Sequence, residues 1–594
     1  MEKQTDKVRQ CGLTRMILNV TRLAIRKSPG MFLLFFILLA GTGLCTAGNV
    51  FFKRNFFDMV EALVRGEGTM GLAMGSGIAM ALFLIVTLAI QAVSELVYEN
   101  FSMKIRGHLG KALNDKASRI DLIVYEDSRF LDCINKAYVG LEATVEVVFS
   151  TLTIVFKEVA YFIFMGAYFF SIKPVLLIMF GISFLPTIIG ASIRRRMYAG
   201  LENRAAPYRR KYEYFEKCIC AREYAKETRL WRAEGFFKER YRENLGEYTR
   251  LQWKTTKHSE LVEIALRFLL LTGYVGTIVM LLYYLFQGEI SVGAFAAVFS
   301  SLDQLFDRME NVFNYQVSSI TRQFGAAQNY YGFLNLKERE GRSEGNLMRE
   351  RIELRGVCFA YPNSTSNALS DINMIVEKGE TVAIVGVNGS GKSTLMRILM
   401  GLFVPTEGKM LIDGKDIKSF SPLTLNRGVS AVFQRYQCYK MTVEENVRLS
   451  DIENGIGVEV ALKKADFPLD SVKFTEGIDT MLGKDFGGID LSGGQWQRLA
   501  IARGLYRDHD MIILDEPTAA IDPLEEADIY HKFAEMSRGK TAFIVTHRLG
   551  SAKIADRIIV MEAGHIVETG THEELMEMGG CYSELYQAQA KWYE

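Results

Sequence analysis

Long apolar stretches in the first half of the chain set the strongest limit on its fold. A membrane-spanning helix needs about 20 mostly apolar residues, and candidate segments of this kind all precede residue 315. They are 31–52, 72–94, 146–170, 172–193, 262–286 and 290–313. Inside a bilayer, backbone polar groups must be satisfied within the protein, which favours helices. The sequence therefore predicts an α-helical transmembrane domain of six spans over residues 31–336.

The first and last of these membrane-associated segments are less regular than the others. In residues 1–30, apolar side chains alternate with arginine and lysine, which predicts an amphipathic elbow lying in the membrane interface. The segment 290–313 contains Asp303, Asp307 and Arg308, so a soluble amphipathic helix is the alternative there. Its very short connection to the preceding span favours a hairpin back through the bilayer.

Lysine and arginine are distributed unevenly between the connections, and this asymmetry predicts orientation. Residues 1–30, 98–143 and 194–260 carry seven, seven and eighteen of them. The alternate connections at 53–71, 173 and 287–289 carry three, one and none. We expect a multi-pass protein of the cell (cytoplasmic) membrane, with both termini and the C-terminal domain in the cytoplasm. Short segments near 125–137 and 220–231 are expected at the turns of the two long cytoplasmic loops.

The overall charge and the cysteines exclude several other classes of protein. The 70 lysines and arginines nearly balance 69 aspartates and glutamates, so a strongly basic nucleic-acid-binding protein is excluded. The eight cysteines show no paired spacing typical of zinc sites. We therefore expect a protein whose partners include the lipid bilayer but no nucleic acid.

The pattern changes to that of a soluble domain after a hydrophilic linker at 337–350. Over 351–594, short β-rich runs alternate with helical stretches, which indicates an α/β domain with a largely parallel sheet. Its first strand–loop–helix unit contains VNGSGKST and fits the G-x-x-x-x-G-K-[ST] phosphate-binding loop. Lys392 is expected to reach the β and γ phosphates of ATP, and the Ser393 hydroxyl to bind Mg²⁺. The expected ATP-binding residues of this loop are Gly386, Asn388, Gly389, Ser390, Gly391, Lys392, Ser393 and Thr394.

Two further motifs complete a nucleotide site. The apolar strand MIILDEP ends in Asp515, which fits a Mg²⁺ role, and Glu516, which can polarise an attacking water. The LSGGQ motif places small residues at the start of a helix, a second phosphate-binding geometry. One chain folds one pocket around Lys392, so this second motif implies a partner chain. The expected contacts to the partner's ATP are Ser492, Gly493, Gly494 and Gln495.

The P-loop, the LDE strand and LSGGQ together resemble those of the ATP-binding cassette (ABC) transporters. Six spans followed by one cassette are similar to an exporter-type half-transporter. The resemblance implies a helical transmembrane domain joined to an α/β P-loop domain, whose mixed parallel sheet carries a helical subdomain. One departure from the family pattern lies at residues 482–488, where the chain reads LGKDFGG instead of a Gly-Glu-Arg-Gly run.

The resemblance also assigns four site residues that would carry little meaning alone. It implies that Tyr361 in FAYP stacks on adenine and that Gln434 in AVFQ senses Mg²⁺ and faces the membrane helices. It implies that Asp522 in AAID contacts the partner cassette and that His547 in IVTH holds the γ-phosphate. The expected catalytic residues are then Glu516, His547 and Gln434, and the expected Mg²⁺ ligands are Ser393, Gln434 and Asp515.

The function that these features predict is an ATP hydrolase coupled to export. The substrate is expected to be a peptide, a drug-like molecule or another amphipathic compound, moved by alternating access. A lipid or lipid-conjugate flippase of the same architecture is the alternative, and a non-transporting ATP-gated membrane regulator is a further one. The intact Glu516 argues for turnover. Because no site residue is damaged, we expect a homodimer, with a heterodimer of two half-transporters as the other arrangement.

Charged residues inside the predicted spans mark a candidate translocation path. Ionisable groups at membrane depth are costly and tend to face a cavity or one another. The candidates are Lys157, Glu158, Asp303 and Asp307. The alternative is that they lie in cytoplasmic extensions of long helices or form structural pairs. Arg267 is expected to extend its side chain toward the inner interface.

Overall fold

The computed structural model of the chain describes residues 12–339, 341–342, 349–453, 457–516, 533, 537, 539–547 and 549–591. Contacts divide the chain into two compact units. The first comprises Met1–Asp115 and Cys133–Asn335, and the second comprises Lys116–Asp132 and Leu336–Glu594. The segment 116–132 therefore packs with the C-terminal domain, although it connects two helices of the first unit.

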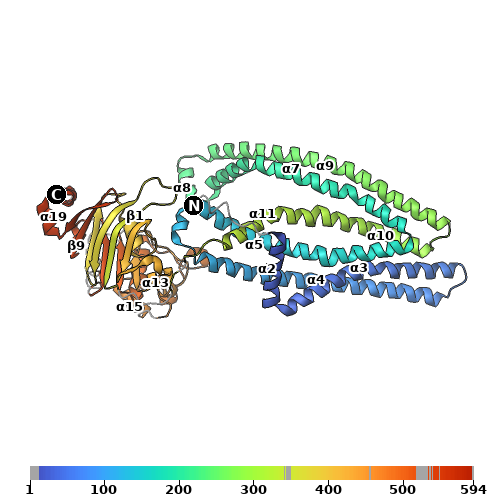
Figure 1. Ribbon diagram of the computed structural model, residues 1–594, viewed down its shortest axis with the longest axis horizontal. Helices are drawn as coiled ribbons and strands as arrows, with labels where there is room; N and C mark the ends of the chain where they lie inside the picture. Colours follow the sequence, from blue (N-terminus) through green and yellow to red (C-terminus); the bar gives the residue numbers. More distant parts are fainter. Residues whose placement is uncertain are drawn as a thin grey trace. The chain divides into compact units, whose positions relative to one another are not determined.

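The first unit consists of helices, several of them far longer than a bilayer is thick (Figure 1). They are α2 (Leu13–Lys27), α3 (Pro29–Val64), α4 (Met70–Ala117), α5 (Ser128–Thr153), α6 (Val159–Ile172), α7 (Pro174–Cys220), α8 (Arg222–Leu230), α9 (Glu234–Phe286), α10 (Val292–Glu310) and α11 (Val317–Leu334). Two π-helical turns, η2 (Ile154–Glu158) and η3 (Asn311–Gln316), join α5 to α6 and α10 to α11. Pro29 and Pro174 begin α3 and α7, where a proline ring fits the first turn.

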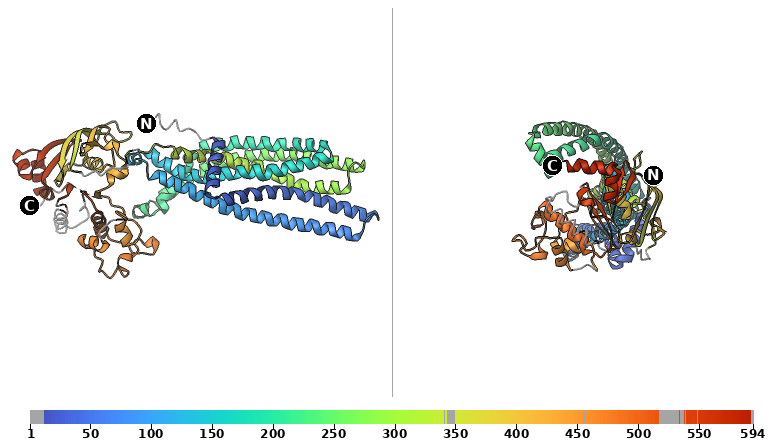
Figure 2. Two further views of the ribbon diagram at one scale, coloured as in Figure 1. Left: turned by 60° about the horizontal axis from the view of Figure 1, so that its bottom comes forward. Right: turned by 90° about the vertical axis from the view of Figure 1, so that its left-hand side faces the viewer.

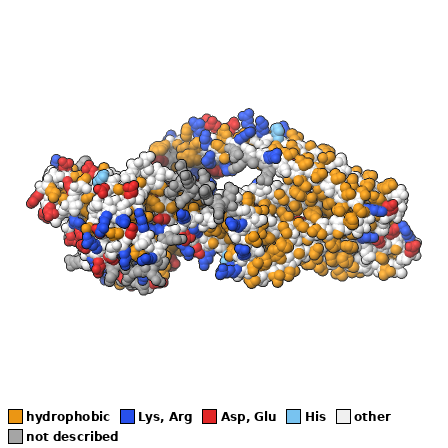
Figure 3. Space-filling view, viewed as in Figure 1, with side chains coloured by type: hydrophobic (Ala, Val, Ile, Leu, Met, Phe, Trp, Pro, Cys, Tyr) orange, Lys and Arg blue, Asp and Glu red, His pale blue; other side chains and the backbone are white. Residues whose placement is uncertain are grey.

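Within the described residues, five helical segments are long and apolar enough to cross a membrane. They lie in Pro29–Val64, Met70–Ala117, Phe130–Ile172, Pro174–Tyr198 and Glu234–Phe286. Their outward faces are apolar, with Leu33, Ile85 and Phe268 each more than 60% exposed. Hydrophobic side chains accordingly dominate the visible face over these helices (Figure 3). Such a surface suits lipid rather than water, so the chain is a multi-pass membrane protein.

The sixth predicted span is a helix, but it is not among these five because of its charged residues. This helix, α10, packs along α3 through a fully buried stripe of Ala297, Val298 and Leu302. Its first turn is fixed to α3 as well, since the Gly293 amide donates to Asp58 Oδ1 over 3.0 Å. A Cβ at Gly293 would lie 2.1 Å from that same oxygen, so the close approach requires glycine. The sixth helix is therefore positioned by packing against the first.

Helices α7 and α9 run side by side along most of their length (Figures 1 and 2). The short helix α8 joins their ends and lies where the sequence predicts the second cytoplasmic turn, at 220–231. Leu230 and Trp231, at the end of α8, are 78% and 68% exposed. An apolar turn of this kind, at the end of two long polar helix extensions, is a surface suited to contact with another protein.

An ion pair ties the third predicted span to the sixth helix. Arg308 Nη1 on α10 donates to Glu158 Oε2 in η2 over 3.0 Å, and its guanidinium lies over the Tyr161 ring at 4.5 Å. The two charged side chains are only 16% and 7% exposed. Removing Arg308 would leave the buried Glu158 carboxylate with the more distant Lys157 ammonium, 4.0 Å away, which is costly.

The second unit contains two sheets, and the larger one supports the sequence motifs. Its strands are β1 (Arg351–Phe359), β2 (Leu369–Glu377), β3 (Thr381–Gly386), β4 (Glu407–Ile412), β5 (Lys415–Asp416), β6 (Val429–Val432), β7 (Met511–Asp515), β8 (Thr541–Val545), β9 (Arg557–Glu562) and β10 (His565–Gly570). One sheet has the order β2-β1-β4-β5 and the other β10-β9-β3-β8-β7-β6. Among the described strands of the second sheet, only β10 is antiparallel to its neighbour. The predicted parallel sheet is thus a mixed sheet with a parallel core.

Several helices lie beside these sheets (Figure 1). They are α12 (Lys392–Leu399), α13 (Pro422–Asn426), α14 (Val443–Arg448), α15 (Val458–Lys464), α16 (Gly493–Tyr506), α18 (Leu549–Ala552), α19 (His572–Met578) and α20 (Cys581–Ala590). Helices α14, α15 and α16 pack together around a core that includes Leu462 and Leu499. This helical part, inserted between β6 and β7, is the subdomain that the resemblance implies.

The segment 116–132 joins the second unit through its short 3₁₀ turn η1 (Leu122–Glu126). Ile123 packs against the apolar core of the second unit, and Glu126 Oε1 accepts from Arg397 Nη1 over 3.2 Å. Lys116 Nζ also donates to Glu338 Oε1 over 2.9 Å. This turn overlaps the first cytoplasmic turn expected near 125–137, and it contacts the helix that follows the P-loop.

The buried pair of Glu158 and Arg308 generates a stability prediction. Arg308→Met should lower the free energy of unfolding by about 3–5 kcal/mol, because it leaves the buried Glu158 carboxylate with the more distant Lys157 ammonium, 4.0 Å away, in place of a close partner. The double variant Glu158→Gln/Arg308→Met should recover much of that loss. Thermal unfolding of the detergent-purified protein provides the measurement. Arg250→Met, which breaks an exposed pair with Glu247, is the control and should change little. Equal losses in the single and double variants would contradict a paired role.

Candidate functional site

The P-loop connects strand β3 to helix α12, and its glycines keep the backbone free of side chains. Gly386 and Gly391 have φ values of 148° and 102°, which disfavour other residues. A Cβ at Gly386 would lie 2.2 Å from the Met561 carbonyl oxygen, and one at Gly391 would lie 2.7 Å from that of Ala368. The loop therefore leaves its amides available at the start of a helix, where anions bind.

Lys392, the first residue of α12, turns its ammonium back over this loop. Its Nζ donates to the carbonyl oxygens of Gly386 and Val387 over 2.9 and 3.0 Å. Burial lowers the pKa of Lys392, while the nearby carboxylates of Glu516 and Asp515 oppose that shift. The predicted loop residues lie together here; Asn388, Gly389 and Ser393 are exposed, and Ser390 and Thr394 are buried.

Three strand ends bring Glu516, Gln434 and His547 together. Gln434, two residues after β6, donates from Nε2 to Glu516 Oε2 over 2.7 Å. His547, two residues after β8, contacts the other carboxylate oxygen through its Nε2. Glu516 follows β7 directly with φ at 47°, a left-handed conformation that is strained for this residue and common at functional sites. The three residues that the sequence predicts to be catalytic are thus in contact in the structure.

The electrostatics of this group favour one protonation pattern. Burial raises the pKa of Glu516. Burial lowers the pKa of His547, and the Lys392 ammonium lowers it further. A neutral His547 can donate one N–H to the Glu516 carboxylate, as Gln434 does. Burial, with the adjacent Glu516 charge, raises the pKa of Asp515 as well. Arg397 and Lys392 oppose the raised pKa of Asp515, and Lys392 opposes that of Glu516.

The polar atoms left without partners indicate what the site can bind. Within the described part of the chain, Asp515 Oδ1 and Ser390 Oγ are buried and make no hydrogen bond. Buried polar atoms rarely stay unsatisfied, and these two lie in the strand end and loop expected to hold Mg²⁺ and phosphate. The same described residues contain no cluster of three or more His, Cys, Asp or Glu side chains suited to a metal. Mg²⁺ held mainly by phosphate oxygens and water, with Asp515 as the one carboxylate among its protein ligands, fits this arrangement.

Tyr361 lies beside the first turn of α12. Its hydroxyl hydrogen-bonds with Thr394 Oγ1 at 3.0 Å and accepts from Arg397 Nη1 over 3.1 Å. Its ring meets the Phe359 ring edge-on, with centroids 5.2 Å apart. The expected adenine-stacking residue is therefore held in a fixed orientation next to the P-loop helix.

The LSGGQ motif forms the start of α16 with a reciprocal cap. Ser492 Oγ accepts from the Gln495 amide, and the Gln495 side chain accepts from the Ser492 amide. Added Cβ atoms at Gly493 and Gly494 would meet nothing within 4 Å, so the motif presents an open backbone surface. Asp522, the other expected contact to a partner cassette, lies outside the described residues.

Tyr436 is a member of this region that the sequence analysis did not select. It lies two residues beyond Gln434, and its hydroxyl donates to the Gly493 carbonyl oxygen over 2.8 Å. One short loop therefore contacts both Glu516, through Gln434, and LSGGQ, through Tyr436. A lone tyrosine in a loop carries no sequence pattern that reveals such a contact.

The substituted segment 482–488 is stabilised locally. Lys440 pairs with Asp485 and lies over the Phe486 ring at 5.7 Å, while Phe486 itself is 60% exposed. Lys484 Nζ lies 3.5 Å from Asp490 Oδ2. The segment therefore keeps an ordered shape with an exposed aromatic ring in place of the charged run.

The candidate path residues are placed in different environments. Lys157 lines a cavity of the first unit, whereas the adjacent Glu158 is paired with Arg308. Asp303 Oδ1 accepts from the Tyr274 hydroxyl over 2.8 Å. Asp307 is exposed one turn further along α10. The structure does not gather all four side chains into one group.

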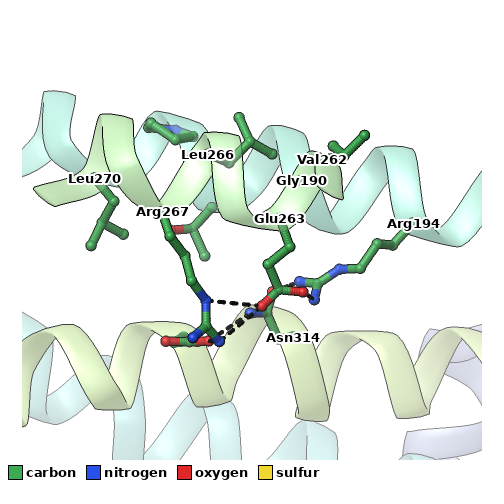
Figure 4. Close-up of a pocket in the computed structure, with 11 residues that line it drawn as sticks. Gly190, Arg194, Val262, Glu263, Leu266, Arg267, Leu270 and Asn314 are labelled. Atoms are coloured by element: carbon green, nitrogen blue, oxygen red, sulfur yellow. Dashed lines mark hydrogen bonds and ion pairs between the residues drawn. The ribbon is translucent and has the colours of Figure 1, made fainter. Parts of the chain in front are cut away.

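Arg267 belongs to a separate charged cluster between α7, α9 and α10 (Figure 4). It donates to Glu263 Oε1 and Glu310 Oε1 over 2.9 and 2.6 Å, and Arg194 pairs with the other oxygen of Glu263. The cavity beside this cluster holds only about 40 Å³. Two arginines and two glutamates neutralise one another here.

Comparison with known proteins gives a family match within the second unit and a fold match for the chain. Residues 369–519 match the family described as "ABC transporter". The chain has the fold of a solved structure described as a bacterial Atm1-family ABC exporter with ATP bound. The TM-score is 0.76 at 22% identity, covering 96% of this chain and 99% of that one.

Three curated relatives show similarity over part of their length. The subtilin transport ATP-binding protein SpaT of Bacillus subtilis is 33% identical over 61% of this chain and 60% of its own. The ATP-dependent lipid A-core flippase of Hahella chejuensis is 36% identical over 51% and 52%. ATP-binding cassette sub-family B member 6 of Mesocricetus auratus is 32% identical over 62% and 44%. The matches thus span about half the length of these relatives.

The fixed orientation of Tyr361 generates a binding prediction. Tyr361→Ala should weaken ATP binding about tenfold, because stacking of a base on an aromatic ring contributes about 1–3 kcal/mol. Tyr361→Phe keeps the ring and removes only the contacts with Thr394 and Arg397, so it should bind ATP nearly as well as the wild type. Equilibrium binding of ATP to the purified protein measures both. If the alanine variant binds with unchanged affinity, Tyr361 does not contact adenine.

Proposed function

This chain belongs to the ATP-binding cassette (ABC) transporters, and on that premise we propose that it hydrolyses ATP to drive export across the cell membrane. The observation that carries the proposal is the group of Glu516, Gln434 and His547 beside the P-loop. It is a group of hydrolytic side chains on a chain whose other unit is built for a bilayer. ATP is the expected nucleotide, and Mg²⁺ is the expected ion beside it.

Each residue of the site has a distinct proposed task. The P-loop amides and Lys392 bind the phosphates, and Ser393, Gln434 and Asp515 would hold Mg²⁺, which neutralises phosphate charge when bound. Glu516 orients the attacking water and accepts its proton. Gln434 and His547 hold both carboxylate oxygens of Glu516, so the base is fixed before a water arrives. His547 is then the residue placed to reach the γ-phosphate.

A second chain completes each site in this proposal. LSGGQ caps its own helix and presents open glycines, so it has room for a phosphate from another cassette. Ser492, Gly493, Gly494, Gln495 and Asp522 would supply these contacts. The exposed Leu230 and Trp231 beside α8 offer a further apolar surface for the same partner. A homodimer is the simplest assembly, because one chain supplies every residue of a complete site.

Closure of two cassettes on ATP would then move the membrane helices. The turn η1 links α4 and α5 to the cassette through Ile123 and the Glu126–Arg397 ion pair. Movement of the cassette can therefore pass directly to two helices of the first unit. A difference in ATP affinity between open and closed states supplies the energy for such a shift. The lysine- and arginine-rich connections support cytoplasmic placement of the cassette and both termini.

We propose the substrate by chemical class. The name of one relative specifies subtilin transport and that of another a lipid A-core flippase. A peptide or other amphipathic molecule is our first proposal, and a lipid flippase of the same architecture is the second. A non-transporting regulator fits less well, because Glu516 is held by two partners as a hydrolytic base requires.

The role of Glu516 can be tested by a single substitution. Glu516→Gln should lower steady-state ATP hydrolysis about 10²–10⁴-fold, since it removes the base, while ATP binding persists through Lys392 and the P-loop. Hydrolysis and binding are measured on the protein in nanodiscs. Glu577→Gln, on the exposed surface of α19, is the control and should leave turnover unchanged. Turnover of Glu516→Gln within a few-fold of the wild type would remove this residue from the mechanism.

The homodimer can be tested by mixing two inactive chains. Glu516→Gln and Ser492→Arg damage opposite halves of a shared site, so each variant alone should be inactive. In a mixed dimer one site carries both defects and the other carries neither, so coexpression should restore ATP hydrolysis. The native mass should be twice 67.1 kDa. A monomeric mass together with no restoration contradicts the proposal, as does activity that requires a different polypeptide.

A further inference from the structure

The largest recorded cavity of the first unit has the size of a ligand site. Its volume is about 770 Å³, and its walls come from α3, α4, α5, η2 and η3. Ligand-binding cavities in proteins typically measure about 300–1,000 Å³. Leu39, Ala92 and Leu96 supply apolar surface, and Tyr98 supplies an aromatic ring with a hydroxyl. A molecule of several hundred Å³ with apolar groups can be accommodated.

The charged side chains of this cavity are unbalanced. Glu95 and Glu99 lie one turn apart on α4, so both carboxylates come from the same helix and repel each other. Lys157 is the only cation among the residues recorded in the cavity lining. Its Nζ lies 4.0 Å from Glu158 Oε1, a carboxylate already paired with Arg308. The lining therefore carries one negative charge in excess.

The charged cluster of Arg194, Glu263, Arg267 and Glu310 provides an internal contrast. There, each glutamate contacts an arginine directly, and the adjoining space is about 40 Å³ (Figure 4). In the large cavity, Glu95 Oε1 accepts a hydrogen bond from a neutral group, Gln91 Nε2, over 3.2 Å. The protein thus neutralises its charges where space is small and leaves a carboxylate pair where space is large.

A further hydrogen-bond acceptor lines this cavity. Gln316, in the π-helical turn η3, lines the cavity, and its Oε1 is buried without a partner among the described residues. Together with the two carboxylates it makes three acceptor groups around an apolar space. Acceptors and negative charge attract cations and N–H donors and repel anions.

We propose that this cavity binds the exported substrate and that Glu95 and Glu99 select an amphipathic cation. The inference rests on the proposed export function and names the substrate class for it. The apolar walls bind the hydrophobic part of the molecule, and the carboxylate pair binds the positive charge. Anionic lipids and acidic peptides are excluded by the same charges. Lys157 opposes cation binding, because its ammonium lies in the same lining.

Two hydrophobic ions of nearly equal size provide the test. Tetraphenylphosphonium is a cation and tetraphenylborate an anion, so they differ mainly in the sign of their charge. Binding of each is measured by equilibrium dialysis against the full chain in nanodiscs, with empty nanodiscs subtracted. The wild type should bind the cation and show much weaker binding of the anion.

Three variants give opposite expectations. Glu95→Gln/Glu99→Gln should weaken binding of tetraphenylphosphonium about tenfold or more, the equivalent of about 1.4 kcal/mol. Lys157→Met should strengthen it several-fold, a gain that a merely disrupted fold cannot produce. Glu67→Gln removes an exposed carboxylate in the connection between α3 and α4 and should change nothing.

The outcomes separate this inference from the export proposal. ATP hydrolysis by the wild type is measured on the same nanodiscs. If hydrolysis is present but both ions bind equally, or if the glutamine variants bind the cation as well as the wild type does, the cation inference is wrong and the ATPase stands. If neither ion binds, the cavity is not a site for amphipathic ions. If hydrolysis is absent, the proposed function itself fails.

Discussion

The nucleotide site depends on the two contacts that fix the Glu516 carboxylate. One oxygen accepts from Gln434 and the other contacts His547, so three strand ends must lie in register before this group can form. The order of β6, β7 and β8 in the sheet provides that register. Because Gln434 lies in the loop that also carries Tyr436, the same contact extends to LSGGQ. The site is therefore connected to the surface that a partner would meet.

A second constraint, the bilayer, shapes the other unit. Helices must satisfy their own backbone groups, and charged groups inside must be paired or face a cavity. Some charged groups form ion pairs. Glu158 pairs with Arg308, and a second cluster pairs Arg194, Glu263, Arg267 and Glu310. Glu95 and Glu99, which follow the span predicted at 72–94, line the large cavity instead. The distribution of matched and unmatched charge is what distinguishes packing from a candidate ligand site in this unit.

Patterns of residue type predict much of this architecture. The length of the apolar stretches predicts the membrane-spanning helices, and the glycine spacing of the P-loop predicts the strand–loop–helix unit. The sixth helix is harder, since its composition is mixed and its position depends on packing against α3 and on Asp58 at its first turn. The path residues illustrate the same limit. Lys157 and Glu158 are neighbours in sequence, yet one lines a cavity and the other is paired, because their partners come from distant helices.

Some features follow only from three-dimensional contacts. Tyr436 meets Gly493 from 57 residues away, and Glu95 and Glu99 become notable only once a cavity is found beside them. The segment 116–132 reads as part of a cytoplasmic loop, but its contacts place it with the cassette. Long-range packing of this kind leaves no local periodicity in a single sequence.

Hydrolysis of ATP at Glu516 should drive a cation through the first unit, and one transport measurement tests both steps. Proteoliposomes with the cassette outside are supplied with Mg-ATP and tetraphenylphosphonium, and accumulation of the cation in the lumen is followed. The account predicts ATP-dependent accumulation by the wild type and none by Glu516→Gln. Wild-type protein that hydrolyses ATP while the cation enters no faster than with Glu516→Gln would contradict it.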